Sequence, residues 1–220
     1  MPNSPDFSLG VLAAGLSKRM ERDKAWLPLG DATMIEQVIR RCAGPSTTIL
    51  ISAAEGRHLP PSLDVFEKCP DRYLDAGPLA GFESLRRVAD SEWLVIVPCD
   101  MPFLDHEVLQ RLVAAGQAHL GCDQVILKGE RGRYSLPQAL GPDAYGPILA
   151  AIESGNNRLL GWADPARCLA LDAVPLVEQR GGNLLENLNH SETYEEAKRS
   201  FAASADRELT PDVDDGFEPC

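Results

Sequence analysis

The stretch FSLGVLAAGLSKRMERDKAWLPLG, residues Phe7–Gly30, decides which fold the sequence predicts. It opens with a mostly apolar run, Phe7–Ala13, which is typical of a strand buried on both faces of a parallel sheet. The small residues that follow predict a turn in which backbone N–H groups can approach a phosphate or a base closely. Four basic residues then fall within seven positions, namely Lys18, Arg19, Arg22 and Lys24. By itself such a loop is more often a solvated surface than a triphosphate site.

Similar apolar runs alternate with helical patterns along the rest of the chain. Further strands are expected at Thr47–Ser52, Trp93–Val97, Asp123–Leu127 and Arg167–Leu171. Helices are expected at Thr33–Cys42, Gly81–Ala89, Asp105–His119, Asp143–Ser154, Arg158–Ala163 and Glu192–Ala203, with Asp105 as an N-cap. The alternation predicts one α/β domain with a mostly parallel central sheet that helices cover on both faces. This domain is expected to span residues 1–203, and an acidic, flexible tail residues 204–220.

The composition of the chain excludes some classes of binding partner. The 220 residues carry a formal net charge of −12, which argues against non-specific binding to nucleic acid or to anionic membranes. No apolar run approaches the ~20 residues that span a bilayer, and the N-terminal segment lacks the basic residues of a secretory signal. The six cysteines are scattered without metal-ligand spacing, so reduced thiols are expected. We therefore expect a cytoplasmic protein.

Ligands of open α/β sheets bind at the carboxyl ends of strands. This rule selects three places, which are the residues after Ala13, after Ser52 and after Val97. The third is VIVPCDMPFL, where Asp100 comes just past the strand. A hard carboxylate that faces a basic loop is the usual way to hold a Mg²⁺–phosphate complex. The alternative for Asp100 is a helix or turn cap. The loop after Ala13 has neither the P-loop pattern nor G-x-G-x-x-G.

Four segments in the same order resemble the motifs of the molybdenum-cofactor nucleotidyltransferases, the MobA-like family. They are LAAGLSKRMERDKAWLPL at 12–29, DAGPLAG at 75–81, PCDMPFL at 98–104 and LLENLNHSETYEEAK at 184–198. The resemblance implies a Rossmann-like, three-layer nucleotidyltransferase fold with GT-A-like topology. It also implies transfer of GMP from GTP to molybdenum-bearing molybdopterin, with release of pyrophosphate and a requirement for Mg²⁺. The expected partners are GTP and molybdopterin, with a molybdoenzyme or its chaperone as a further partner.

The resemblance assigns a role to each residue that matches a motif. Catalytic roles fall to Arg19, Lys24 and Asp100, the first two neutralising charge on the triphosphate. Nucleotide contacts fall to Leu12, Ala13, Ala14, Gly15, Ser17, Lys24, Asp71, Gly77, Pro78, Gly81 and Asp100. Metal ligation falls to Asp100 and Asn189, with Asn187 as a weaker candidate. The alternatives are structural: a surface carboxylate for Asp71, a turn and a helix start for Gly77 and Gly81, and a helix cap for the asparagines.

Two residues depart from the guanylyltransferase pattern. Ala14 stands where Gly is usual, which is more typical of cytidylyltransferases, and Glu21 places a carboxylate inside the basic loop. The segments DKAWLPL, GPLAG and PCDMPFL follow the guanylyl pattern and favour GTP. Open alternatives are cytidylyl transfer to molybdopterin, nucleotidyl transfer to another phosphorylated small molecule, and a non-catalytic nucleotide or cofactor carrier.

The acceptor region is less well marked by the sequence. Basic side chains that could hold the pterin phosphate, or be solvated surface charges, are Lys128, Arg131, Arg133 and Arg158. Trp162 and Tyr134 could stack on a pterin, although core or lid packing is the commoner role of such residues.

Overall fold

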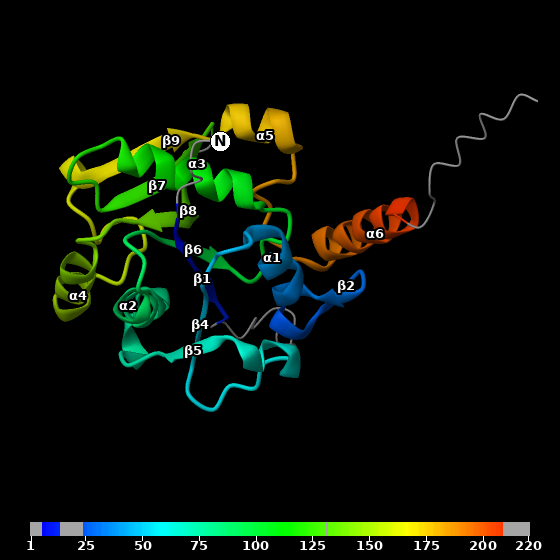
Figure 1. Ribbon diagram of the computed structural model, residues 1–220, viewed down its shortest axis with the longest axis horizontal. Helices are drawn as coiled ribbons and strands as arrows, with labels where there is room; N and C mark the ends of the chain where they lie inside the picture. The colour runs from blue at the N-terminus through cyan, green and yellow to red at the C-terminus, as the bar shows by residue number, and fades with distance from the viewer. Residues whose placement is uncertain (1–5, 14–23, 131, 209–220) are drawn as a thin grey trace, which may run out of the picture.

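The computed structural model describes residues 6–13, 24–130 and 132–208. Its centre is a seven-stranded sheet in the order β5-β4-β1-β6-β8-β7-β9 (Figure 1). The strands are β1 Ser8–Leu12, β4 Ile49–Ala53, β5 Glu67–Pro70, β6 Leu94–Pro98, β7 Gln124–Gly129, β8 Gly132–Leu140 and β9 Cys168–Asp172. Only β8 is antiparallel to its neighbours in this sheet; the other pairings are parallel. The mostly parallel α/β sheet is therefore confirmed.

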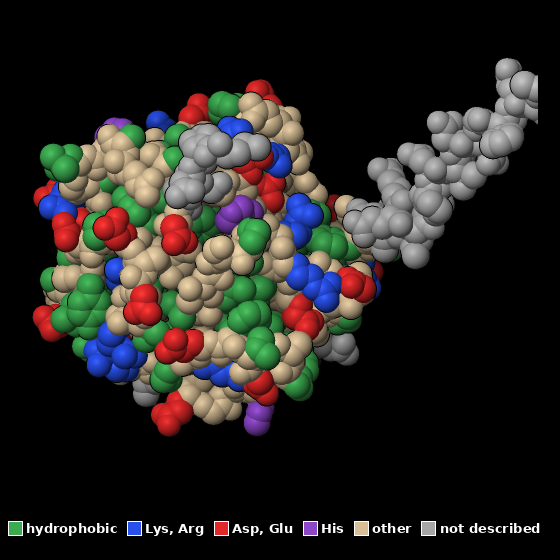
Figure 2. Space-filling model, in the orientation of Figure 1, with side chains coloured by type: hydrophobic (Ala, Val, Ile, Leu, Met, Phe, Trp, Pro, Cys, Tyr) green, Lys and Arg blue, Asp and Glu red, His purple; other side chains and the backbone are tan. Residues whose placement is uncertain are grey.

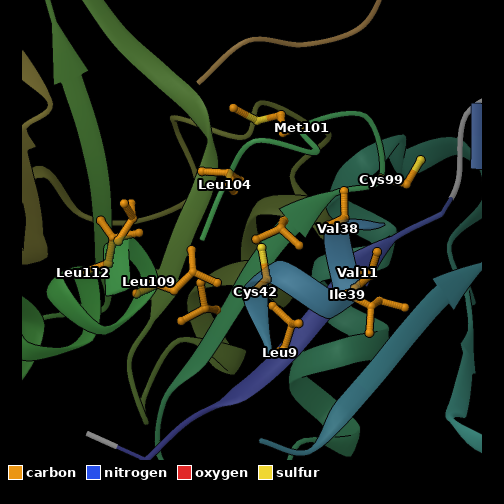
Figure 3. Packing of buried hydrophobic residues seen from close by; sticks show 14 of the residues in the cluster. Leu9, Val11, Val38, Ile39, Cys42, Cys99, Met101, Leu104, Leu109 and Leu112 are labelled. Atoms are coloured by element: carbon orange, nitrogen blue, oxygen red, sulfur yellow. The ribbon is translucent and has the colours of Figure 1, made fainter. Parts of the chain in front are cut away.

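Helices cover both faces of the sheet. On one side lie α1 (Met34–Cys42) and α3 (His106–Gln117), and on the other α2 (Pro78–Val88) and α4 (Tyr145–Glu153). Successive strand residues alternate between two cores: Leu9 and Val11 pack on the α1/α3 side, and Leu12 packs on the α2/α4 side. This is why the strands are apolar without a polar face. Figure 3 shows the α1/α3 core at close range.

Local hydrogen bonds explain where two of the helices begin. The carboxylate of Asp105 accepts a 3.0 Å hydrogen bond from the amide of Val108, so Asp105 is the predicted N-cap of α3. At α1, Thr33 and Glu36 form a capping box in which the Glu36 carboxylate accepts from both the amide and the hydroxyl of Thr33.

The expected helix at Arg158–Ala163 is wrong. This segment consists of turns and bends. The carbonyl oxygen of Leu159 accepts hydrogen bonds from the buried amides of Gln138 (2.8 Å) and Gln124 (3.1 Å). Because these long-range side-chain bonds hold the backbone of the segment against the sheet, tertiary contacts override the local helical pattern.

Three further segments complete the chain. A short hairpin pairs β2 (Pro28–Leu29) with β3 (Ala32–Thr33), α5 (Val174–Arg180) follows β9, and α6 runs from Ser191 to Glu208. The helix α6 extends away from the sheet in Figure 1, and its first turns pack on the hairpin. No helix among the described residues has the length and apolarity to cross a membrane. Figure 2 shows acidic and basic side chains interspersed over one face.

Candidate functional site

Three strand ends meet at one edge of the sheet, as expected. The strands β4, β1 and β6 are neighbours, and Leu12 is in register with Ser52 on one side and with Pro98 on the other. The amide of Ala13 donates a 2.9 Å hydrogen bond to the carbonyl oxygen of Ser52, and the amide of Cys99 donates a 3.3 Å bond to that of Leu12. These bonds place Leu12 and Ala13 between the other two strand ends.

Asp100 lies at this edge of the sheet, and buried neighbours on both sides hold its backbone in place. The residues on either side of it, Cys99 and Met101, are both buried in the core that Figure 3 shows, and Asp100 itself is partly exposed. Cys99 and Met101 are therefore packing residues. Their burial fixes the direction of the backbone at Asp100.

The late asparagine segment reaches the same place from the far end of the chain. The amide of Leu188 donates a 2.9 Å hydrogen bond to the carbonyl oxygen of Asp100. The Leu188 side chain is fully buried beside Leu27 and Leu29 of the hairpin region. Asn189, the next residue, is partly buried, and the bond made by Leu188 places its backbone near that of Asp100. The two residues that the resemblance assigns to the metal are brought together in space.

Asp71 lies beside the second strand end. Its Oδ1 accepts a 2.7 Å hydrogen bond from the hydroxyl of Ser52 and a 3.4 Å bond from that of Ser84 on α2. Both serines are fully buried. Neither hydroxyl was predicted from the sequence to belong to the site. For Ser52, the sequence feature that could have indicated it is a serine inside an otherwise apolar strand.

The glycines of the GPLAG segment have different structural reasons. Gly77 has φ +56°, a left-handed conformation that favours glycine, and it precedes Pro78, the first residue of α2. A Cβ on Gly81 would lie 2.6 Å from Cδ2 of Leu12 and 2.7 Å from Oγ of Ser52. Gly81 therefore lets α2 pack directly on β1 and β4, beside the strand ends.

The basic loop falls mostly outside the described residues. Ala14, Gly15, Ser17, Lys18, Arg19, Glu21 and Arg22 all lie there. The described chain resumes at Lys24, the first residue of a short 3₁₀ helix, η1 (Lys24–Trp26). The indole of Trp26 donates a 3.0 Å hydrogen bond to the carbonyl oxygen of His58. This bond connects η1 to the loop after β4. The contact was not predicted from the sequence.

The cysteine nearest Asp71 is not a nucleophile. Burial raises the pKa of the Cys69 thiol on β5 to about 11, so the group stays protonated at neutral pH. Burial also raises the pKa of the Cys42 thiol on α1.

The basic residues that could hold the pterin phosphate lie in two separate parts of the structure. Lys128 and Arg133 are opposite each other and exposed in the part of the β7–β8 hairpin that extends past its pairing with β6. Arg158 is exposed in the loop after α4, and Arg131 lies outside the described residues. Trp162 is 5% exposed and donates to Oε1 of Gln138, so it is a core residue and does not stack on a ligand.

Tyr134 is half-buried and lines a cavity of about 320 Å³ between the β7–β8 hairpin and α5. The cavity is lined by Gly129, Glu130, Tyr134, Ala173, Val174, Val177 and Glu178. Its two charged lining residues are carboxylates, which would repel the phosphate of a pterin substrate.

Comparison with known proteins agrees with this geometry. A family model described as "MobA-like NTP transferase domain" matches residues 9–180. The molybdenum cofactor guanylyltransferase of Shewanella loihica is 29% identical over 174 residues, covering 77% of this chain and 86% of that relative. The molybdenum cofactor guanylyltransferase of Shewanella pealeana is 30% identical over 157 residues, covering 69% and 76% respectively.

A solved structure shares the fold. The crystal structure of molybdopterin-guanine dinucleotide biosynthesis protein A from Archaeoglobus fulgidus matches with a TM-score of 0.72 at 20% identity, over 89% of this chain and 99% of that one. At this identity the likeness concerns the fold alone.

Proposed function

The chain belongs to the MobA-like NTP transferase family, and we propose that it transfers GMP from GTP to molybdenum-bearing molybdopterin. The observation that carries the proposal is the hydrogen bond between the amide of Leu188 and the carbonyl oxygen of Asp100. It joins the last motif to the third strand end, beside Leu12 and Ala13. The relatives at 29% and 30% identity are molybdenum cofactor guanylyltransferases, which supports this choice of substrates.

The reaction is a displacement at the α-phosphorus of GTP. An oxygen of the terminal phosphate of molybdopterin attacks, a new P–O bond forms, and the bond to the bridging oxygen of pyrophosphate breaks. The protein has little covalent work to do in such a step, so catalysis depends on position and on charge. In this proposal Arg19 and Lys24 neutralise charge on the triphosphate, and Asp71 contacts the nucleotide. The backbone of Leu12, Ala13 and the residues after them would lie against the base.

Asp100 and Asn189 fit a magnesium ion that protein and nucleotide share. Both offer oxygen ligands, and Mg²⁺ is usually held by one or two carboxylates together with phosphates and water. Within the described residues no group of three or more His, Cys, Asp or Glu side chains could hold a metal by itself. When bound, the ion would neutralise the phosphates and the leaving pyrophosphate. Asp100 would anchor it, and the Leu188 hydrogen bond would set the distance of Asn189 from it.

The proposal is tested by the release of pyrophosphate from Mg·GTP in the presence of molybdopterin that carries molybdenum. GTP-dependent release, with formation of the guanine dinucleotide, is the expected result. The same assay with CTP, UTP and ATP tests the base, because Ala14 leaves cytidylyl transfer as the alternative. Release with CTP but not with GTP would replace the guanylyl assignment.

A non-catalytic carrier is the other alternative, and Glu21 within the basic loop motivates it. A carrier would bind Mg·GTP, as measured by a rise in melting temperature, and would release no pyrophosphate when molybdopterin is added. The Glu21→Gly variant tests what this carboxylate does to GTP binding. If Glu21 weakens triphosphate binding, the variant binds GTP more tightly than the native protein; if its side chain points away, the affinity is unchanged.

A further inference from the structure

Helix α2 buries one carboxyl group, that of Glu83, whose side chain has no exposed surface. Its Oε1 accepts a 2.6 Å hydrogen bond from Nη2 of Arg72 and a 3.0 Å bond from the hydroxyl of Tyr145, the first residue of α4. Nε of Arg87 lies 3.7 Å from the same oxygen. Oε2 is buried and has no hydrogen-bond partner among the residues that the structure describes.

A buried carboxylate stabilises the contact between α2 and α4 only weakly. The desolvation of a buried carboxylate offsets much of its attraction to a partner, and an oxygen without a hydrogen bond adds to the cost. An apolar side chain of similar size would hold α2 against α4 at least as well. The presence of Glu83 therefore indicates a role beyond packing. Its closest partner, Arg72, indicates that this role concerns the loop in which Arg72 lies.

Arg72 directly follows Asp71, and the two side chains bind consecutive residues of α2. Asp71 accepts from the hydroxyl of Ser84, while Arg72 pairs with Glu83. The hydrogen bond to Glu83 is the main cause of a raised pKa of Arg72, so this guanidinium is held in its charged form. It also lies 5.8 Å from the ring centroid of Tyr73. The start of the loop is thus fixed on α2 at two adjacent points.

The same loop is tied to α4 further along. The side-chain amide of Asn157, just past the end of α4, donates a 3.0 Å hydrogen bond to the carbonyl oxygen of Asp75. Tyr145 at the start of α4 binds Glu83. Residues 71–77 therefore form hydrogen bonds with α2 and with the loop after α4, and Glu83 connects α2 to the start of α4.

We propose that Glu83 is a positioning residue for nucleotide binding: through Arg72 it holds the loop that presents the Asp71 carboxylate at the sheet edge. The inference rests on the proposed function, in which Asp71 contacts the nucleotide. Asp71 is also bound by Ser52 of β4, so its carboxylate has a fixed place only while the loop keeps its backbone next to that strand. Glu83 supplies the charged anchor that keeps it there.

The test compares Glu83→Gln with Glu92→Gln, which removes the same charge from an exposed position in the turn before β6. Two quantities are measured that need no turnover: hydrogen exchange of peptides covering residues 71–77, and the affinity for Mg·GTP. In Glu83→Gln we expect faster exchange in 71–77 and about tenfold weaker binding, which corresponds to ~1.4 kcal/mol. Glu92→Gln should match the native protein in both.

A double-mutant cycle separates positioning from a general loss of stability. If Glu83 acts through Asp71, Glu83→Gln should weaken GTP binding much less in an Asp71→Asn background than in the native one. The Arg72→Gln/Glu83→Gln variant replaces the ion pair by two neutral side chains and leaves neither of its charges without a partner, so it should fold even if Glu83→Gln does not. It should bind Mg·GTP as weakly as Glu83→Gln.

The outcomes are distinguishable. Unchanged exchange in 71–77, unchanged affinity, or fully additive effects with Asp71→Asn would overturn the positioning role. A native protein that binds Mg·GTP but transfers no GMP would overturn the proposed function and leave the positioning role standing.

Discussion

The amide of Leu188 and the carbonyl oxygen of Asp100 form a 2.9 Å hydrogen bond that joins the end of the domain to the end of strand β6. Both partners are backbone groups, so the contact does not depend on either side chain. It places the backbone of Asn189, the residue after Leu188, next to that of Asp100 at this edge of the sheet. Residues that lie far apart in the sequence thus form one site.

Replacing Asp100 by alanine should lower the rate of GMP transfer by about 100-fold or more, because the proposed metal loses its only carboxylate from this strand end. The fold should persist, since the side chain is partly exposed and the backbone bond to Leu188 is kept. Pyrophosphate release and the melting temperature measure the two effects. Asp90→Ala, at an exposed position before β6, is the matched control. Near-native activity in Asp100→Ala would remove this residue from the metal site.

Replacing Leu188 by alanine should lower the free energy of unfolding by about 2–5 kcal/mol, because the side chain is fully buried beside Leu27 and Leu29. The affinity for Mg·GTP should fall as well, since Asn189 loses its support. Leu188→Met keeps the volume and should cost less than about 1.5 kcal/mol. Urea unfolding and calorimetric titration measure the two quantities. Loss of stability with unchanged nucleotide affinity would show that this segment does not serve the site.

Replacing Gly81 by alanine should destabilise the protein by about 1–3 kcal/mol, because the new Cβ would lie 2.6 Å from Leu12 and 2.7 Å from Ser52. The helix α2 must shift away from the strand ends, and nucleotide affinity should fall with it. Gly146→Ala is the control, since Gly146 lies exposed in α4 and its Cβ would meet nothing within 4 Å. That change should be neutral or stabilise the protein by up to about 1 kcal/mol. Equal effects of the two substitutions would contradict the packing argument.

Replacing Lys24 by alanine should raise the KM for GTP by roughly tenfold, because a point charge near the triphosphate is lost. The effect should shrink at high salt, where charges are screened. Lys18→Ala removes an equal charge from the same loop and should leave the KM unchanged, since the family resemblance assigns no role to Lys18. Steady-state kinetics at two ionic strengths provide the measurement. An unchanged GTP dependence in Lys24→Ala would exclude this residue from the site.

The capping box of α1 should make stability depend on pH in the acid range. Hydrogen bonds from Ser62 and then from Thr33 lower the pKa of Glu36 below its usual 4.5. A lowered folded-state pKa means that the contribution is complete above the unfolded value and is lost as the pH falls through the folded value. The stability difference between the native protein and Glu36→Gln should therefore be largest at neutral pH and disappear in strong acid. Urea unfolding across this range measures it, and a constant difference would contradict the assignment.

Much of the sheet could be predicted because its central strands β1, β4 and β6 are almost entirely apolar. Burial on both faces removes the alternation of a half-exposed strand, and this leaves a signal in any short window of sequence. The N-cap Asp105 was predictable for a similar reason, since its partner, the amide of Val108, is three residues away. The turns at Arg158–Ala163 were not, because the amides that hold Leu159 come from Gln124 and Gln138, on other strands.

The sequence by itself determined the α/β class, most of the central strands and their covering helices, and the four motif segments that resemble one family, but it missed β5, β8 and α5. The tertiary structure alone decided which of those segments meet. It showed that Leu188 binds Asp100, that Gly81 is required by packing on Leu12, and that α2 buries Glu83. The physical reason is that apolar periodicity and capping act within a few residues, whereas the hydrogen bonds and close packing that assemble a site join residues whose separation along the chain leaves no local pattern.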